Sequence, residues 1–296
     1  MKRPLVVIAI LTCCSLFVGP ARASTPVAEL IAAARVGDVQ RIDALLSDNA
    51  DLINATDARG RTPLHAAADA LSVSAADRLI DAGADVNARN RDGAAPLHLT
   101  ALTTTTAHRA AASRAAMTKL LIQKGADAGA ADAQALQPLH LAALKGRDEM
   151  LPLLTAAGAR TDAKDRLGRT PLHHAAMGNH KGTIAWLIDH GADVNAPDAT
   201  GNTPLHSAAL RFRENATRLL IAKGANVNAA NAEGKTPLHT AAGAGPEAPE
   251  VERLLIGVVR ELLDAGADAT AKDKSNNTAR DYALQKQRHQ LVQMLP

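Results

Sequence analysis

A short phrase, Thr-Pro-Leu-His or its last three residues, recurs along this chain at a nearly constant interval. The prolines of its six copies lie 33 residues apart at four of the five steps and 42 apart at the other; they are Pro63, Pro96, Pro138, Pro171, Pro204 and Pro237. A fixed period of this length predicts a stacked array, in which each unit buries its apolar face against its neighbours. Such an array predicts a binding surface and not an enzyme pocket.

Each copy of the phrase predicts the start of a helix, because threonine is a good N-cap and proline is tolerated at the first helical position. The alanine-rich run that follows combines high helix propensity with small side chains, so neighbouring helices can pack closely. A second phrase, Gly83-Ala84-Asp85-Val86-Asn87, is echoed at residues 191–195 and 224–228 and follows apolar residues. Glycine suits the left-handed residue that ends a helix, so a second helix is predicted to end there.

With these two phrases the chain resembles the ankyrin repeat family and, with its N-terminal segment, bacterial exported or periplasmic members of that family. The resemblance implies an all-α fold, an ankyrin-repeat solenoid of helix-turn-helix repeats with long turns and about eight repeats including two caps. We expect one ankyrin repeat domain over 24–296, with an N-cap repeat at 25–58, repeats at 59–91, 92–133, 134–166, 167–199, 200–232 and 233–274, and a C-cap repeat at 275–296. The resemblance leaves the partner open, because ankyrin arrays serve many unrelated partners.

Two repeats are longer than the others by the same amount. From His98 to Gly125 and from His239 to Gly266 the chain runs 27 residues, whereas the same interval spans 18 in most repeats. Each therefore carries nine extra residues between its two helices. A longer loop or an extended second helix would explain them, since surface positions accept insertions at small cost. The alternative is that they form binding loops.

Residues 1–23 have the pattern of a secretory signal peptide. Lys2-Arg3 precede an apolar run from Leu5 to Val18, and Ala21-Arg22-Ala23 forms a small-residue cleavage site. The run is shorter than the ~20 residues that a membrane-spanning helix needs, so we expect export to the periplasm first, secretion second, and no stable membrane anchor after cleavage. Both cysteines, Cys13 and Cys14, lie inside this segment. Lipoprotein signals have a small residue such as Gly or Ala directly before the cysteine, whereas here Thr12 precedes Cys13. The sequence therefore disfavours lipidation.

Cleavage would also change the charge balance of the chain. Lys2, Arg3 and Arg22 would leave with the signal, which lowers the 33 basic residues to 30 and so matches the 30 acidic ones. The electrostatic footprint of nucleic-acid binding is then missing, and aromatic residues, at 1% of the chain, are too few to stack bases. We expect no nucleic acid partner.

No pattern of catalytic or metal-binding residues stands out. The chain has no G-x-S-x-G or H-E-x-x-H motif and no dinucleotide fingerprint. The histidines of the repeated phrase recur once per repeat, at about the 8–10 Å spacing of packed helices, which is too far apart to share a zinc ion. The resemblance implies that each of them links its own turn to the next repeat by a hydrogen bond. We therefore expect no catalytic residue, cofactor or metal and no enzyme, although an unrecognised enzyme stays a weak alternative.

The candidate site is a surface on the turn tips and on the exposed end of each first helix, where the resemblance implies that a partner docks. Its residues are Arg59, Arg61, Asp69, Arg91, Leu144, Lys145, Arg166, Arg169, Met177, Leu210, Arg211, Phe212 and Lys235. Basic residues outnumber acidic ones on this face, so we expect the partner to be a protein with an acidic patch. We also expect the array to be a monomer. A secreted effector acting on a host protein is the alternative. Phe212 occupies a turn position where other repeats have Gly146 or Asn179, so it is either an interface anchor or packs under the second insertion.

Overall fold

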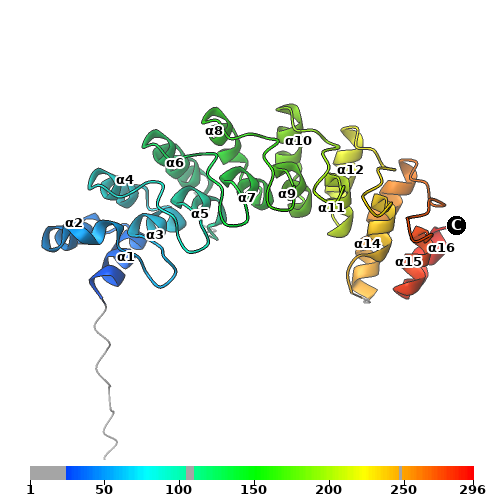
Figure 1. The fold of residues 1–296 in the computed structure, drawn as a ribbon, viewed down its shortest axis with the longest axis horizontal. Helices are drawn as coiled ribbons and strands as arrows, with labels where there is room; N and C mark the ends of the chain where they lie inside the picture. Colours follow the sequence, from blue (N-terminus) through cyan, green and yellow to red (C-terminus); the bar gives the residue numbers. More distant parts are fainter. Residues whose placement is uncertain (1–24, 105–109, 247–248) are drawn as a thin grey trace, which may run out of the picture.

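The computed structural model describes residues 25–104, 110–246 and 249–296, and the predicted signal peptide at 1–23 lies outside them. All regular secondary structure in these ranges is helical, as the repeats predicted. The helices stack side by side into an arch (Figure 1). None of the helices in the described ranges combines the length and the apolar character that a membrane span requires.

The first helices of the repeats form the inner layer of the arch, and each packs against the first helix of the next repeat. They are α1 (Pro26–Val36), α3 (Pro63–Ala70), α5 (Pro96–Leu102), α7 (Pro138–Lys145), α9 (Pro171–Gly178), α11 (Pro204–Leu210), α13 (Pro237–Gly243) and α15 (Ala279–Gln285). Except in α15, each begins at the proline of its repeat. The residue before each first helix has an extended backbone, as an N-cap requires.

The second helices form the outer layer (Figure 1). They are α2 (Val39–Asp48), α4 (Val73–Asp81), α6 (Ala110–Gln123), α8 (Leu151–Ala156), α10 (Lys181–Asp189), α12 (Glu214–Ala222), α14 (Pro249–Asp264) and α16 (His289–Met294), with short 3₁₀ turns η1 (Ala50–Asn54) after α2 and η2 (Asp148–Met150) before α8. Glycines 83, 125, 158, 191, 224 and 266 have positive φ just after six of them. The predicted left-handed helix ends are thus confirmed.

The two insertions extend the second helices of their repeats. Helix α6 has 14 residues and α14 has 16, whereas α4, α10 and α12 have nine each. Residues 105–109 and 247–248 of the insertions lie outside the described ranges. Both second helices are therefore extended, which is one of the two forms that the first interpretation of the insertions allowed.

In each of the two longer repeats, an arginine of the following repeat binds the C-terminal end of the first helix. Arg147 Nη2 donates to the carbonyl oxygen of Thr103 at 2.8 Å, and Arg288 Nη1 donates to that of Ala242 at 2.6 Å. Where the preceding repeat is of normal length, a shorter residue can make the equivalent contact: Ser72 Oγ donates to the carbonyl oxygen of Arg35 at 2.8 Å. Carbonyls at a helix C-terminus lack intrahelical partners, so these side chains cap one repeat from the next.

The apolar core runs between the layers and is divided into two clusters. Each first helix from α1 to α13 contributes a buried leucine and small residues, such as Leu205, Ala208 and Ala209 of α11, which are all fully buried. One cluster extends from Leu30 to Ala159 and the other from Ala143 to Leu295, and Trp186 packs against both. The division falls between the repeats at 134–166 and 167–199.

On the inner side, the repeats are joined by the recurring histidines. The Nδ1 atom of His173 accepts a hydrogen bond from the backbone N–H of Thr170 at 3.1 Å, and its Nε2 atom donates to the carbonyl oxygen of Asn202 in the next repeat at 3.0 Å. The same pair of bonds recurs at His65, His98, His140, His206 and His239. The linking role that the resemblance implied is confirmed.

On the outer side, asparagines join the long turns of neighbouring repeats. Asn195 Nδ2 donates to the carbonyl oxygen of Gly224 at 3.4 Å, and its Oδ1 accepts from the N–H of Asn226 at 2.8 Å. Asn54, Asn87 and Asn228 make equivalent bridges. In the two middle repeats Gly129 and Asp162 stand at this position, and Asp162 is paired with Arg160 of its own turn at 2.8 Å. These asparagine bridges are therefore missing next to the division of the core.

We expect Asp162→Asn to raise the free energy of unfolding by about 0.5–1 kcal/mol, because the new amide can make the bridge that Asn195 makes at the next junction. The lost ion pair with Arg160 is exposed and contributes little. The measurement is urea denaturation at pH 7 followed by circular dichroism. Asn195→Asp is the matched control, and it should lower stability. A lower stability of Asp162→Asn than of the wild type would contradict the expectation.

The histidine bridges predict a loss of stability in mild acid. Burial lowers the pKa of His65, His98 and His206 below 6.5, and that of His140 and His173 to about 4. The unfolded chain then binds more protons between these values, so the stability that is complete above pH 6.5 is lost as the pH falls toward 4. A buried carboxylate with a lowered pKa, such as Asp165, loses its contribution to stability only as the pH falls below about 3.8.

Urea denaturation at pH values from 7.5 to 4.5 tests this expectation. His173→Gln removes the bridging imidazole, so it should lower the free energy of unfolding at pH 7.5 by about 1–3 kcal/mol. Because glutamine does not titrate, the variant should also show a smaller dependence of that free energy on pH. A wild-type stability that does not change over this range would contradict the assignment of these histidines as neutral hydrogen-bonding groups.

Candidate partner-binding surface

The turn tips lie in a row that the backbone itself holds together. The N–H of Arg91 donates to the carbonyl oxygen of Arg59 at 3.1 Å, and that of Arg166 donates to the carbonyl oxygen of Gln134 at 2.9 Å. The same bond joins Ala133 to Asp92, Ala199 to Leu167, Ala232 to Thr200 and Lys274 to Glu233. Side chains on the tips therefore project from a continuous, rigid edge beside the inner helices.

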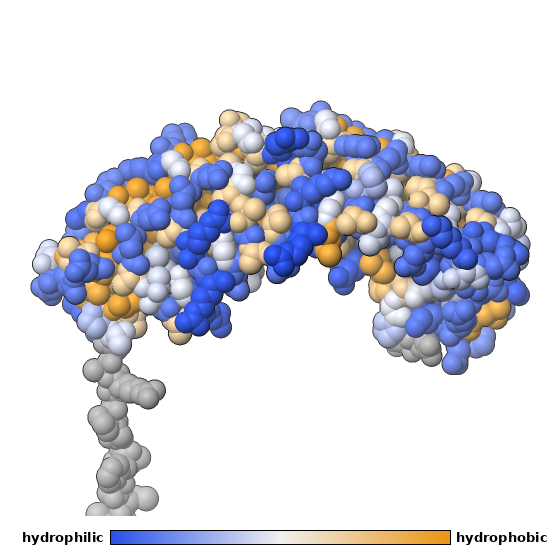
Figure 2. All heavy atoms as spheres, viewed as in Figure 1, coloured by the Kyte–Doolittle hydropathy of each residue, from blue (hydrophilic) through white to orange (hydrophobic). Residues whose placement is uncertain are grey.

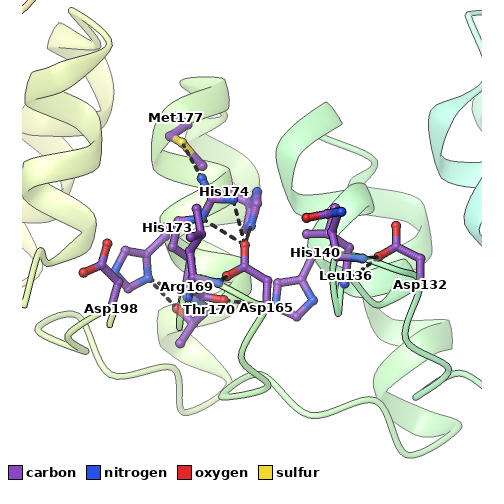
Figure 3. A network of polar contacts seen from close by, with 12 residues as sticks. Asp132, Leu136, His140, Asp165, Arg169, Thr170, His173, His174, Met177 and Asp198 are labelled. Atoms are coloured by element: carbon purple, nitrogen blue, oxygen red, sulfur yellow. Dashed lines mark hydrogen bonds and ion pairs between the residues drawn. The ribbon is translucent and has the colours of Figure 1, made fainter. Parts of the chain in front are cut away.

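Within this edge, Asp165 is the centre of a buried polar network (Figure 3). Its Oδ1 accepts from the backbone N–H groups of Leu167 and Arg169, and its Oδ2 accepts from Arg169 Nε and His174 Nε2, each at 2.9 Å. Burial by itself would raise the pKa of Asp165, but these hydrogen bonds and the Arg169 charge hold it well below 3.8. The carboxylate is thus an anion that fixes the turn.

This network was not predicted from the sequence. His174 lies edge-on to the ring of His140, with centroids 5.4 Å apart, and its Nδ1 atom is buried without a hydrogen-bond partner. The signal was available, because no other repeat has a histidine directly after the recurring one: Ala66, Leu99, Leu141, Ser207 and Thr240 stand there. The described residues include no group of three His, Cys, Asp or Glu side chains placed to hold a metal.

The structure divides the predicted basic residues into paired and unpaired ones. Arg61 is held by Asp57 through its Nε atom at 2.9 Å, Arg169 is held by Asp165, and Lys235 Nζ lies 2.7 Å from Glu233. The exposed residues without an ion-pair partner among the described side chains are Arg59, Arg91, Lys145, Arg166 and Arg211. Only the second group has free positive charge to offer a partner.

The other predicted positions differ in how far they reach solvent. Leu210 has 48% of its surface exposed, whereas Asp69, Leu144 and Met177 are half-buried. Met177 Sδ lies 3.9 Å from Arg169 Nη1, so these two predicted residues contact each other (Figure 3).

Phe212 has the left-handed backbone of the position it occupies. Its φ is 60°, beside 63° at Gly146 and 64° at Asn179. The side chain is half-buried against the C-terminal core cluster, and a Cβ atom added at Gly245 would stand 2.6 Å from Phe212 Cζ. Phe212 therefore packs under the second insertion, which is the second of the two alternatives that the sequence left open.

A groove of about 570 Å³ lies on the concave side of the C-terminal half of the arch, over α9, α11, α13 and α15. It brings together four predicted residues: Arg169, Met177, Leu210 and Lys235. Other residues of its lining were not predicted, and they include Leu167, Ser207, Thr240, Gly243 and Tyr282. In Figure 2 the lower edge of the arch is hollowed between its middle and its C-terminal end. The remaining predicted residues lie outside this groove.

A family model for ankyrin repeats, which describes three copies of the repeat, matches five overlapping stretches of the chain. These are residues 30–105, 107–198, 139–231, 196–257 and 213–295. The matches together span nearly all of the described array, and they agree with its paired helices and its solenoid form. Arrays of this kind are typically interaction modules without catalytic activity. The chain belongs to the ankyrin repeat family, and its array is a protein–protein interaction module.

Proposed function

We propose that this protein is exported and that it holds a partner protein with an acidic surface along its concave face. The observation that carries the proposal is the row of exposed, unpaired basic residues on the turn tips and inner helix ends: Arg59, Arg91, Lys145, Arg166 and Arg211. Unpaired charges of one sign steer a partner of opposite charge and select against partners of like charge.

The paired residues play a different part in this proposal. Arg61 and Arg169 are bound to aspartates of their own turns, so replacing them would disturb the fold together with any interface. A test of the surface must therefore leave them in place. The groove supplies the apolar part of the surface through Leu167, Met177 and Leu210, because tight interfaces combine apolar anchors with charged rims.

Export rests on residues 1–23, whose charged start, apolar run and Ala21-Arg22-Ala23 site support passage across a membrane followed by cleavage. We place the mature protein in the periplasm, with release from the cell as the alternative destination. The same concave surface would serve a secreted effector that binds a host protein.

Cleavage predicts a mature chain that begins at Ser24. Intact mass spectrometry of the protein isolated from the periplasmic fraction of its own cell should give the mass of residues 24–296. Substitution of Ala21 and Ala23 by bulky residues serves as the control, and it should block processing. A chain that keeps residues 1–23, or one that carries lipid on Cys13 or Cys14, would contradict this part of the proposal.

Charge reversal of Arg59, Arg166 and Arg211 to glutamate should abolish capture of the native partner. The assay is crosslinking in the intact producing cell, followed by mass spectrometry of what co-purifies. The matched control reverses Lys119, Lys181 and Arg260, which are exposed on the outer helices α6, α10 and α14 and have no ion pair among the described residues. We expect the control to capture the same partner as the wild type, and both variants to keep the wild-type thermal unfolding midpoint. Equal capture by the concave variant would contradict the surface assignment.

A further inference from the structure

The groove has a recess because a ridge of large side chains stops at Gly243. Four residues beyond the recurring histidine, successive first helices carry Leu102, Leu144, Met177 and Leu210, and the next one carries Gly243. Met177, Leu210 and Gly243 all line the groove. The floor beside Gly243 is formed by the small residues Ser207 and Thr240. A recess between Leu210 and Tyr282 therefore lies where this ridge stops.

The far wall of the recess is Tyr282, and its position is fixed. The Tyr282 hydroxyl donates to Asp273 Oδ2 at 2.6 Å, and the ring lies edge-on to His239 with centroids 6.1 Å apart. Lys235 Nζ lies 5.1 Å from the ring centroid, which is within the range of a cation–π contact. A wall that is already ordered loses little entropy when a ligand side chain packs against it.

The charges within the groove are largely matched. Asp198 Oδ1 accepts from the backbone N–H groups of Thr200 and Asn202, at 2.8 and 2.9 Å, and Glu233 is paired with Lys235 at 2.7 Å. Basic residues without an ion-pair partner among the described residues lie beside the groove. Arg211 follows Leu210 in the chain, and Arg166 precedes Leu167, and both leucines line the groove and are exposed. The surface therefore offers an apolar centre with positive charge on its N-terminal side.

We propose that the recess over Gly243 is a specificity pocket for one bulky apolar side chain of a partner protein segment, whose neighbouring carboxylates contact Arg211 and Arg166. This proposal rests on the proposed function, because it takes a protein segment as the occupant of the concave face. The groove volume of about 570 Å³ accommodates such a side chain together with its flanking backbone. Leucine, methionine, phenylalanine and tryptophan are the side chains of this class.

The test selects a random 12-residue peptide library, displayed on phage, against the purified protein. We expect the enriched peptides to share one bulky apolar residue with Asp or Glu on one side of it. Synthetic copies of these peptides should bind Gly243→Leu at least about tenfold more weakly than the wild type, which corresponds to ~1.4 kcal/mol. Arg166→Ser combined with Arg211→Ser should weaken binding by about three- to tenfold, in a way that added salt reduces.

Lys181→Leu is the matched control for the filled recess. It places the same side chain at an exposed position of the outer helix α10, away from the concave face. Peptide affinity should not change in this variant. A Cβ atom at Gly243 would lie 3.3 Å from Tyr282 Cδ1, so the thermal unfolding midpoint of each variant is measured as well. Leu210→Ser provides a second variant that removes the exposed near wall, and it should also weaken binding.

Three results would overturn the pocket: no enriched sequence, enriched peptides without a bulky apolar residue, or full binding to both Gly243→Leu and Leu210→Ser. The last result, combined with loss of binding on charge reversal of Arg59, Arg166 and Arg211, would leave the proposed function standing and remove only the pocket. Equal binding to every variant would contradict the concave surface as well.

Discussion

Buried histidines join neighbouring repeats at every junction of this array except the first. Each one accepts a hydrogen bond from its own turn and donates one to the following repeat, as His173 does between Thr170 and Asn202. A solenoid packs mainly against its nearest neighbours, so its cohesion is approximately the sum of its junctions. The bridging geometry requires a proton on Nε2 and none on Nδ1, and burial favours this uncharged form. Together with the backbone bonds between turn tips, this contact aligns the inner helices and the binding face.

The junctions are nevertheless unequal. In the middle of the array, Gly129 and Asp162 replace the bridging asparagines on the outer side, and the apolar core divides close by. On the inner side of the same region, Asp165 collects hydrogen bonds from Arg169 and His174. The division itself is crossed on the concave side by His140, whose Nε2 atom donates to the carbonyl oxygen of Arg169 at 3.2 Å.

The basic residues on the concave face have two different roles: some stabilise their own turn, and others are available to a partner. Arg61 and Arg169 look like surface cations in the sequence, but each neutralises an aspartate that organises its own turn. Arg166 and Arg211 have no such partner among the described residues, so their charge is available to another molecule. Charge counted along a sequence therefore overestimates the charge that a partner meets.

The sequence by itself determined the repeat pattern, the start of the first helix at the proline of six repeats, the glycine ends and the linking histidines. These features depend on residues a few positions apart, or on a period that places equivalent residues in register. Only the tertiary structure decided that the insertions lengthen α6 and α14, that Phe212 packs under Gly245, which arginines are unpaired, and that a recess opens at Gly243. Those outcomes depend on distances between side chains of different repeats, because packing and ion pairing follow the neighbours that stacking brings together, and local sequence does not specify them.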